Sequence, residues 1–250
     1  MTKTAAEIAY RLAEERIARA RKTGATVLSL SEDWTENGEY LTDYDARLGD
    51  LETLPPEIKD LSGLATLYLS YTQVSDLSPI AGLTGLRHLE FVHTQVSDLT
   101  PLAGMVALES LNCGDTPVRD LSPIAGLTQL TSFDCGAAEV SDLAPLAAMT
   151  QMRALTFSST DVSDLTPLAG MTALRSLNCI GALADLSALT APGAAWEEED
   201  RDLLEVLFAQ TPATDEGGVL ASLAREAPSA EQTARALALL RKARDAGDVG

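Results

Sequence analysis

The stretch TQVSDLSPIAGLTGL, residues 72–86, decides the fold because the chain repeats it at a fixed interval. It returns as TQVSDLTPLAGMVAL at residues 94–108 and as TPVRDLSPIAGLTQL at residues 116–130. A weaker copy begins at Ala138, and TDVSDLTPLAGMTAL begins at Thr160. Each copy starts 22 residues after the previous one. A constant period of this length predicts a repeat architecture, in which each coil packs against its neighbours.

Each copy contains the pattern of a short strand followed by a turn. Leu67 and Leu69 alternate with Tyr68, so the strand directs two leucines to one side and the tyrosine to the other. Pro79 ends the strand pairing and suits the first turn of a short helix, with Ser78 before it as the expected cap. Parallel strands are therefore expected at residues 66–70, 88–92, 110–114, 132–136, 154–158 and 176–180.

The complete spacing, read from Leu64, is LxxLxLxx(N/T)x(L/V)xxLxP. At this spacing the chain resembles the leucine-rich repeats, and SDLSPIAGLTGL resembles the 22-residue repeats of the internalins. The resemblance covers about residues 41–192. It implies an α/β repeat solenoid, right-handed, with short parallel strands on a concave face where partners usually bind. The threonines at the position where such repeats usually carry Asn are expected to bond the backbone: Thr72, Thr94, Thr116 and Thr160.

The composition changes along the chain predict four segments. They are residues 1–30, an N-terminal helical cap and first strand; 31–60, an acidic insertion and degenerate first repeat; 61–192, the leucine-rich repeats; and 193–250, a C-terminal helical cap or tail. An apolar stack must be covered at both ends, which favours capping for the terminal helices. The C-terminal helices could instead form a separate interaction element.

The first helix is expected over residues 4–22. Thr4 and Glu7 have the spacing of a capping box, and Gly24 is a typical C-terminal stop. A helix followed by a short strand resembles the N-terminal cap of many cytosolic bacterial leucine-rich-repeat proteins. The expected apolar stripe is Ile8, Leu12 and Ile17.

Residues 31–50 hold seven acidic residues against one arginine, together with Trp34 and Tyr40. Two interpretations remain open. The segment forms either an ordered acidic, aromatic loop that contacts a partner, or a solvated loop with its tryptophan packed on the cap. The spacing that indicates a degenerate repeat here comes from Leu41, Tyr44, Ala46, Gly49 and Leu51.

The formal net charge is −19, which argues against nucleic acid or an anionic membrane as a partner. It favours a basic protein partner, or serves solubility alone. No apolar core of a signal peptide opens the chain, and no stretch approaches 18 uninterrupted apolar residues. We therefore expect a cytoplasmic monomer, although the internalins that the repeats resemble are often exported surface proteins.

The three cysteines occupy an inward strand position and are expected to be buried, reduced thiols: Cys113, Cys135 and Cys179. No cofactor and no metal site is expected. A ladder of aspartates also suggests calcium, but its fixed offset before each turn favours structural capping. Its members are Asp76, Asp98, Asp120, Asp142 and Asp164.

The outward side chains of the strands are not needed to form the core. Their aromatic and ionisable members cluster in the first repeats. The predicted partner-binding residues are Tyr68, Tyr71, His88, Glu90, His93 and Asp115, joined by Trp34 and Tyr40 from the insertion. Tyrosine is a typical interface anchor. The histidines and carboxylates could also form an acid–base site. No nucleophile motif or phosphate-binding loop accompanies them, so we predict no catalytic residue.

The sequence therefore predicts a non-enzymatic protein–protein interaction module: an adaptor, an inhibitor or an immunity-type protein that binds a basic partner through its concave face. The alternative is an effector-type protein that supports an enzymatic activity such as ubiquitin ligation, with the helical tail as its functional element. Bacterial ubiquitin ligases with such repeats carry a large domain built around a catalytic cysteine. Residues 193–250 contain no cysteine, which disfavours the alternative.

Overall fold

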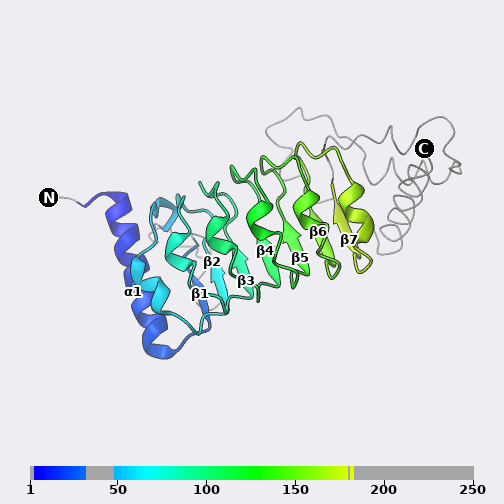
Figure 1. The fold of residues 1–250 in the computed structure, drawn as a ribbon. Helices are drawn as coiled ribbons and strands as arrows, with labels where there is room; N and C mark the ends of the chain where they lie inside the picture. The colour runs from blue at the N-terminus through cyan, green and yellow to red at the C-terminus, as the bar shows by residue number, and fades with distance from the viewer. Residues whose placement is uncertain (1–2, 32–47, 180, 183–250) are drawn as a thin grey trace, which may run out of the picture.

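A computed structural model of the chain describes residues 3–31, 48–179 and 181–182. The described chain winds into an elongated array of coils that stack side by side (Figure 1). Its strands are Val27–Ser29 (β1), Thr66–Tyr68 (β2), His88–Glu90 (β3), Ser110–Asn112 (β4), Ser132–Asp134 (β5), Ala154–Thr156 (β6) and Ser176–Asn178 (β7). They form one sheet in chain order, and each neighbouring pair is parallel. The predicted leucine-rich-repeat solenoid is confirmed.

The regular strands are shorter than predicted, but the hydrogen bonding between coils continues beyond them. Leu69 N–H donates to the Glu90 carbonyl at 2.8 Å, and Tyr71 N–H donates to the Val92 carbonyl at 2.8 Å. The same pair of bonds recurs in the following coils. Each coil therefore stays in register with the next as far as the residue at which the chain turns out of the sheet.

The opposite side of each coil carries short 3-10 turns. They are Leu48–Asp50, Pro56–Asp60, Ser78–Ile80, Thr100–Leu102, Ser122–Ile124, Ala144–Leu146 and Thr166–Gly170. The predicted cap at Ser78 is wrong, because its hydroxyl makes no capping bond. Asp76 Oδ1 accepts instead from Ser78 N–H at 2.7 Å, and the other aspartates of the ladder make the same bond. Structural capping by that ladder is confirmed.

The inward side chains stack into a continuous core. The first inward position of strands β2 to β7 is at most 2% exposed, and its members are Leu67, Leu89, Leu111, Phe133, Leu155 and Leu177. The three cysteines occupy the second inward position and are buried, as predicted. Burial raises the pKa of all three thiols, that of Cys179 to about 12. The threonine hydroxyls at the turns donate to the carbonyl three residues earlier, at 2.6–2.9 Å.

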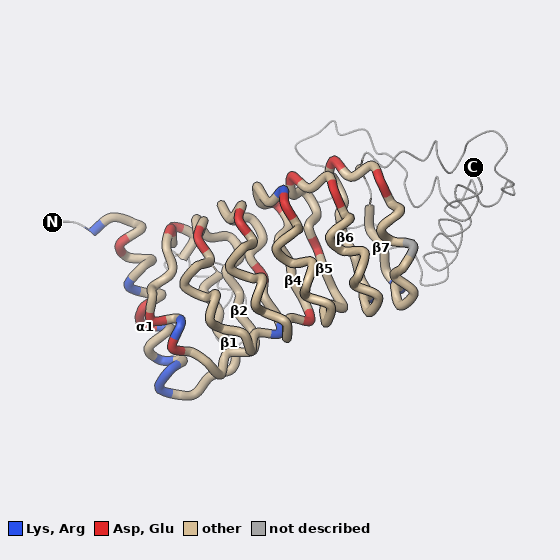
Figure 2. Tube along the Cα trace, in the orientation of Figure 1, with Lys and Arg blue, Asp and Glu red and all other residues tan. Residues whose placement is uncertain are grey.

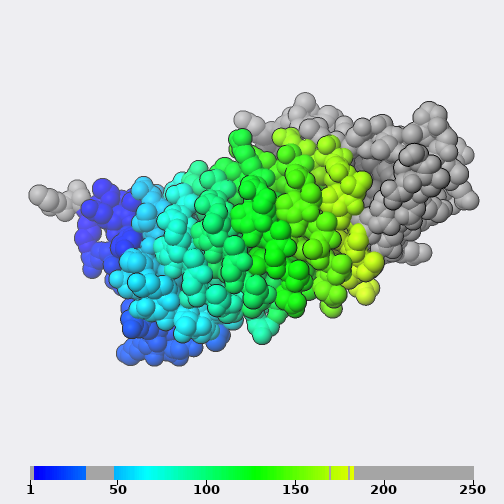
Figure 3. Space-filling model, viewed as in Figure 1, coloured from blue at the N-terminus to red at the C-terminus, as the bar shows by residue number. Residues whose placement is uncertain are grey.

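Helix α1, Ala5–Thr23, covers the N-terminal end of the array (Figure 3). The predicted capping box is present, and Gly24 ends the helix in the left-handed conformation at φ 64°. The predicted apolar stripe is only partly right: Ile17 is buried as predicted, but the other buried residues are Ala9, Ala13 and Ala20. Alanine lets the helix approach the first coils closely. In the described part of the chain, no helix is long and apolar enough to cross a membrane.

Strand β1 pairs directly with β2, with Val27 opposite Thr66. The expected degenerate repeat between them therefore adds no strand to the sheet, and β1 itself fills the first place. Of its proposed residues, Gly49 lies in a 3-10 turn and Leu51 is buried, whereas Leu41, Tyr44 and Ala46 lie outside the described residues. The predicted acidic loop and C-terminal helices also fall outside that part of the chain.

Candidate functional site

A row of residues at the exit of the sheet shares one unusual backbone conformation. We call it the turn row, and its members are Tyr71, His93, Asp115, Ala137, Ser159 and Gly181. All six have positive φ, from 51° to 75°. The chain turns out of the sheet here in every coil, which fixes this conformation.

The turn row is costly for most of its residues. Left-handed backbone costs a residue other than glycine about 1–2 kcal/mol. Asp and His adopt it more readily than most, whereas tyrosine and alanine gain nothing from it. Gly181 shows that glycine fits the position without strain, at φ 75°. Six consecutive coils nevertheless carry six different residue types, so the fold does not dictate which side chain stands there.

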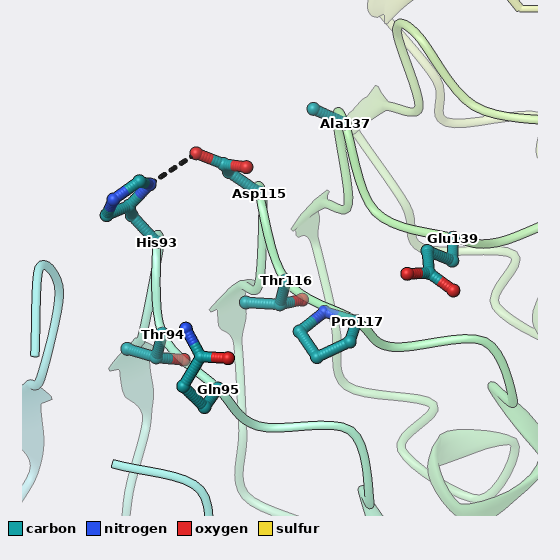
Figure 4. A pocket seen from close by; sticks show the side chains of 8 residues that line it. All are labelled: His93, Thr94, Gln95, Asp115, Thr116, Pro117, Ala137 and Glu139. Atoms are coloured by element: carbon teal, nitrogen blue, oxygen red, sulfur yellow. Dashed lines mark hydrogen bonds and ion pairs between the residues drawn. The ribbon is translucent and has the colours of Figure 1, made fainter. Parts of the chain in front are cut away.

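The first three side chains of the turn row contact one another in a line. The ring centroids of Tyr71 and His93 are 5.5 Å apart, with the rings tilted by 35°. His93 Nδ1 lies 2.5 Å from Asp115 Oδ2 (Figure 4). All three are exposed: Tyr71 by 44%, and the side chains of His93 and Asp115 by 59% and 60%. An aromatic ring, an imidazole and a carboxylate thus form one surface across three coils.

The centre of the concave face carries two further carboxylates. Its register row is Tyr68, Glu90, Asn112, Asp134, Thr156 and Asn178. Glu90 Oε1 accepts from Ser70 Oγ at 2.7 Å, and Asp134 Oδ1 accepts from Gly136 N–H at 2.8 Å. Burial raises the pKa of Asp134, and the charge of Glu90 raises it further, against the Gly136 bond. Among residues 48–179, no Lys or Arg forms an ion pair with Glu90 or Asp134.

Two glycines beside this row stand where consecutive coils pack closely. A Cβ at Gly136 would lie 2.9 Å from Ser158 Oγ, and one at Gly114 would lie 3.1 Å from the Gly136 carbonyl oxygen. Neither position has room for a side chain without a shift of its neighbours. The space beside both glycines is filled by neighbouring atoms of the protein, so close packing between consecutive coils requires glycine there.

An open hollow of about 270 Å³ lies beside the turn row. Ala137, next in the row after Asp115, lines it and has no side chain beyond Cβ (Figure 4). Glu139 borders the hollow on the far side from His93 and forms an ion pair with Arg119. The lining residues are His93, Thr94, Gln95, Asp115, Thr116, Pro117, Ala137 and Glu139.

The structure brings some of the predicted residues together and separates others. Tyr71, His93 and Asp115 form one contact line, and Tyr68 and Glu90 lie nearby in the centre row. His88 opens strand β3 and is exposed, whereas His93 follows the end of that strand. The two histidines therefore lie at opposite ends of strand β3 and cannot act as a pair. Trp34 and Tyr40 lie outside the described residues.

Sequence reasoning missed three parts of the site. Asp134 stands on an outward position but was not predicted to belong to it. The other two are the glycines of the concave face and the loop residues of the hollow: Gly114, Gly136, Gln95, Pro117 and Glu139. The sequence did contain a signal for the turn row. Residues spaced 22 apart from Tyr71 end in Gly181, and glycine is the residue most tolerant of left-handed backbone, so the register indicated a positive φ at this position.

The arrangement is suited to binding. The buried thiols are poor nucleophiles, because only the thiolate reacts and burial disfavours it. Within the described residues, no group of three His, Cys, Asp or Glu side chains could hold a metal ion. Figure 2 shows acidic segments recurring along the upper edge of the array, whereas basic ones gather mostly in α1. The coils therefore offer an acidic, partly aromatic surface.

No protein-family model matches the sequence, and no curated protein matches it. Among solved structures, the internalin InlF of Listeria monocytogenes is 31% identical over 56% of this chain, with a TM-score of 0.50. Internalin C2 of the same species is 26% identical over 75% of this chain and 89% of its own, with a TM-score of 0.56. A leucine-rich-repeat protein of Leptospira interrogans, 16% identical over 64% of this chain and 39% of its own, has a TM-score of 0.52 and shows the fold alone.

The chain is a leucine-rich-repeat protein, and its repeats are internalin-like. Its fold is typically a protein-binding module and is usually non-catalytic. The match covers 45% of the InlF chain, so it spans less than half the length of that structure.

Proposed function

We propose that this chain is a non-enzymatic protein-binding module that recognises a basic protein through the N-terminal half of its concave face. The proposed surface comprises the centre row from Tyr68 to Asp134 and the adjoining turn row from Tyr71 to Asp115. The role that we propose for it is that of an adaptor, an inhibitor or an immunity-type protein. The cytoplasmic location and the monomeric state remain predictions.

The contact line of Tyr71, His93 and Asp115 carries this proposal. These side chains are exposed, contact one another and stand on strained backbone that glycine would relieve. Folding alone does not explain their retention there. Tyrosine buries a large rigid surface at low entropic cost, and such anchors dominate interface energetics at about 2 kcal/mol or more on truncation.

The charge distribution supports a basic partner. Glu90 and Asp134 face the concave side without a described basic counter-charge, and Asp115 adds a third carboxylate at the edge. The whole chain carries a net charge of −19. Such a field attracts a basic partner over long range and makes its association fast and sensitive to salt.

The C-terminal half of the same face differs in character. Its outward residues in β6 and β7 are small and uncharged: Ala154, Thr156, Ser176 and Asn178. They supply neither an aromatic anchor nor a carboxylate. The two halves share their backbone geometry, which makes the C-terminal half an internal control.

The test is a comparison of paired variants of the full chain, each immobilised and exposed to an extract of the source cells. We expect Tyr68→Ala with Tyr71→Ala to lose proteins that the parent retains. Ser158→Ala with Ser176→Ala should retain them. The lost proteins should be basic and should elute from the parent as salt rises. If the tyrosine pair captures the same proteins as the parent and the serine pair does not, the proposed surface is wrong.

A further inference from the structure

The hollow beside the turn row is too small and too open for an ordinary small-molecule site. Ligand pockets occupy about 300–1,000 Å³ and enclose most of their ligand. This hollow holds about 270 Å³ and opens to solvent along the row. Its size suits a single side chain of a larger partner that rests on the neighbouring surface.

The groups around the hollow favour a cationic side chain with an apolar stem. Pro117 and Ala137 supply apolar wall, and the Tyr71 and His93 rings continue that surface along the row. The carboxylates of Asp115 and Glu139 stand on two sides of the hollow (Figure 4). Glu139 pairs with Arg119, but both side chains are exposed, at 48% and 77%. Such a surface pair is weak and can exchange its cation.

Arginine fits these groups better than lysine. Its guanidinium is planar, stacks on aromatic rings and carries five N–H donors, so it can donate to two carboxylates at once. The lysine ammonium is a compact, strongly hydrated point charge, so it cannot stack on the Tyr71 and His93 rings as a guanidinium can. His93 uses one oxygen of Asp115, Oδ2, so Oδ1 can accept from an incoming donor.

We propose that the turn row and its hollow form a subsite for an arginine side chain of the protein partner. The stem of the arginine packs along the Tyr71 and His93 rings, and its guanidinium enters the hollow between Asp115 and Glu139. This proposal rests on the proposed function and specifies the chemistry of the partner. Ala137 is then a specificity residue, because a larger side chain at that position would close the hollow.

The experiment titrates the full chain with N-acetyl-arginine amide and follows backbone amide signals by NMR. We expect saturable shifts at His93, Asp115 and Ala137. The citrulline analogue has nearly the same shape without the charge, and should bind about tenfold more weakly because it lacks charge-assisted hydrogen bonds. The lysine analogue should also bind more weakly than arginine.

Matched variants locate the subsite. Asp115→Asn should weaken arginine binding about tenfold, and Ala137→Asn should abolish it, since asparagine tolerates left-handed backbone but fills the hollow. Ser159→Gly changes the same row outside the subsite and should bind as the parent does. Equal binding of citrulline, or unchanged binding by Asp115→Asn and Ala137→Asn, would overturn the arginine subsite. If the arginine subsite fails but the tyrosine pair is still needed to capture basic proteins, the proposed function stands. If arginine does not bind selectively and the tyrosine pair is not needed for capture, both proposals fail.

Discussion

The first inward row and the turn row lie a few residues apart in each coil and follow opposite rules. The inward row is leucine in five of six coils and phenylalanine in the other: Leu67, Leu89, Leu111, Phe133, Leu155 and Leu177. The turn row has one backbone conformation and six residue types. The inward row is uniform because folding requires a large apolar side chain at that position. Variation at the turn row shows that folding does not fix the residue type there.

The two rows also contribute with opposite sign to stability. Burying one leucine side chain contributes about 1.5–3 kcal/mol, and stacking repeats that contribution in every coil. A non-glycine residue in the turn row costs about 1–2 kcal/mol instead. Substitutions in the two rows should therefore separate folding from binding.

The largest effect is expected from the inward row. Leu111 is 1% exposed in the middle of the stack, so Leu111→Ala should lower the free energy of unfolding by about 2–5 kcal/mol. Urea denaturation followed by circular dichroism measures it. Val106 is 60% exposed, and Val106→Ala should change the same quantity by less than about 0.5 kcal/mol. Similar losses in the two variants would mean that Leu111 does not belong to a packed core.

A smaller effect is expected from the aspartate ladder at low pH. Hydrogen bonds from the hydroxyl and the N–H two residues later lower the pKa of Asp76, Asp98 and Asp120. These groups therefore stabilise the fold above the usual Asp pKa of about 3.9, and the contribution is lost as pH falls through their lowered pKa. The melting temperature should fall accordingly below about pH 4.

The matched control for the acid effect is the triple variant Asp76→Asn, Asp98→Asn and Asp120→Asn. Asparagine keeps the oxygen that accepts the backbone N–H but does not titrate between pH 2 and pH 4. Its melting temperature should fall less over that interval than that of the parent. A parallel fall in both chains would show that other carboxylates govern acid unfolding.

The smallest effect is expected from Ser159→Gly in the turn row. Relief of left-handed strain at φ 53° gains about 1–2 kcal/mol, whereas the freer unfolded chain costs about 0.4–1 kcal/mol. The free energy of unfolding should therefore rise by between about 0 and about 1.6 kcal/mol. Differential scanning calorimetry measures the change. A clear loss of stability would show that Ser159 has a structural role.

The sequence predicted the parts of the molecule that the period controls. The apolar alternation around Leu67 predicted the strands and the core, Thr4 with Glu7 predicted the helix start, and the second inward position predicted the buried cysteines. Each of these features follows from the spacing of nearby residues, which can be read from a single sequence. The predicted cap at Ser78 was wrong and the stripe of Ile8, Leu12 and Ile17 was only partly right, because hydrogen-bond partners and helix rotation depend on packing.

The candidate site was predictable only in part. Tyr71, His93 and Asp115 were recognised as outward residues of one region. Their mutual contacts were not, because they depend on a backbone reversal that repeats at each coil. The hollow is lined by residues of three consecutive coils, among them Ala137 with its short side chain and Glu139 in the loop after it. Such features appear only when consecutive coils are stacked in space.

The central claim is that Tyr71, His93 and Asp115 stand in the turn row for binding and not for folding, and Tyr71→Gly tests it most directly. Glycine removes the ring and relieves the positive φ of 60° at the same site. Melting temperature and capture of proteins from the source-cell extract are measured on the same preparation, beside Ser159→Gly. The account predicts that Tyr71→Gly melts at or above the parent and loses the captured basic proteins, whereas Ser159→Gly keeps them. A melting temperature several degrees below the parent, or unchanged capture, would contradict it.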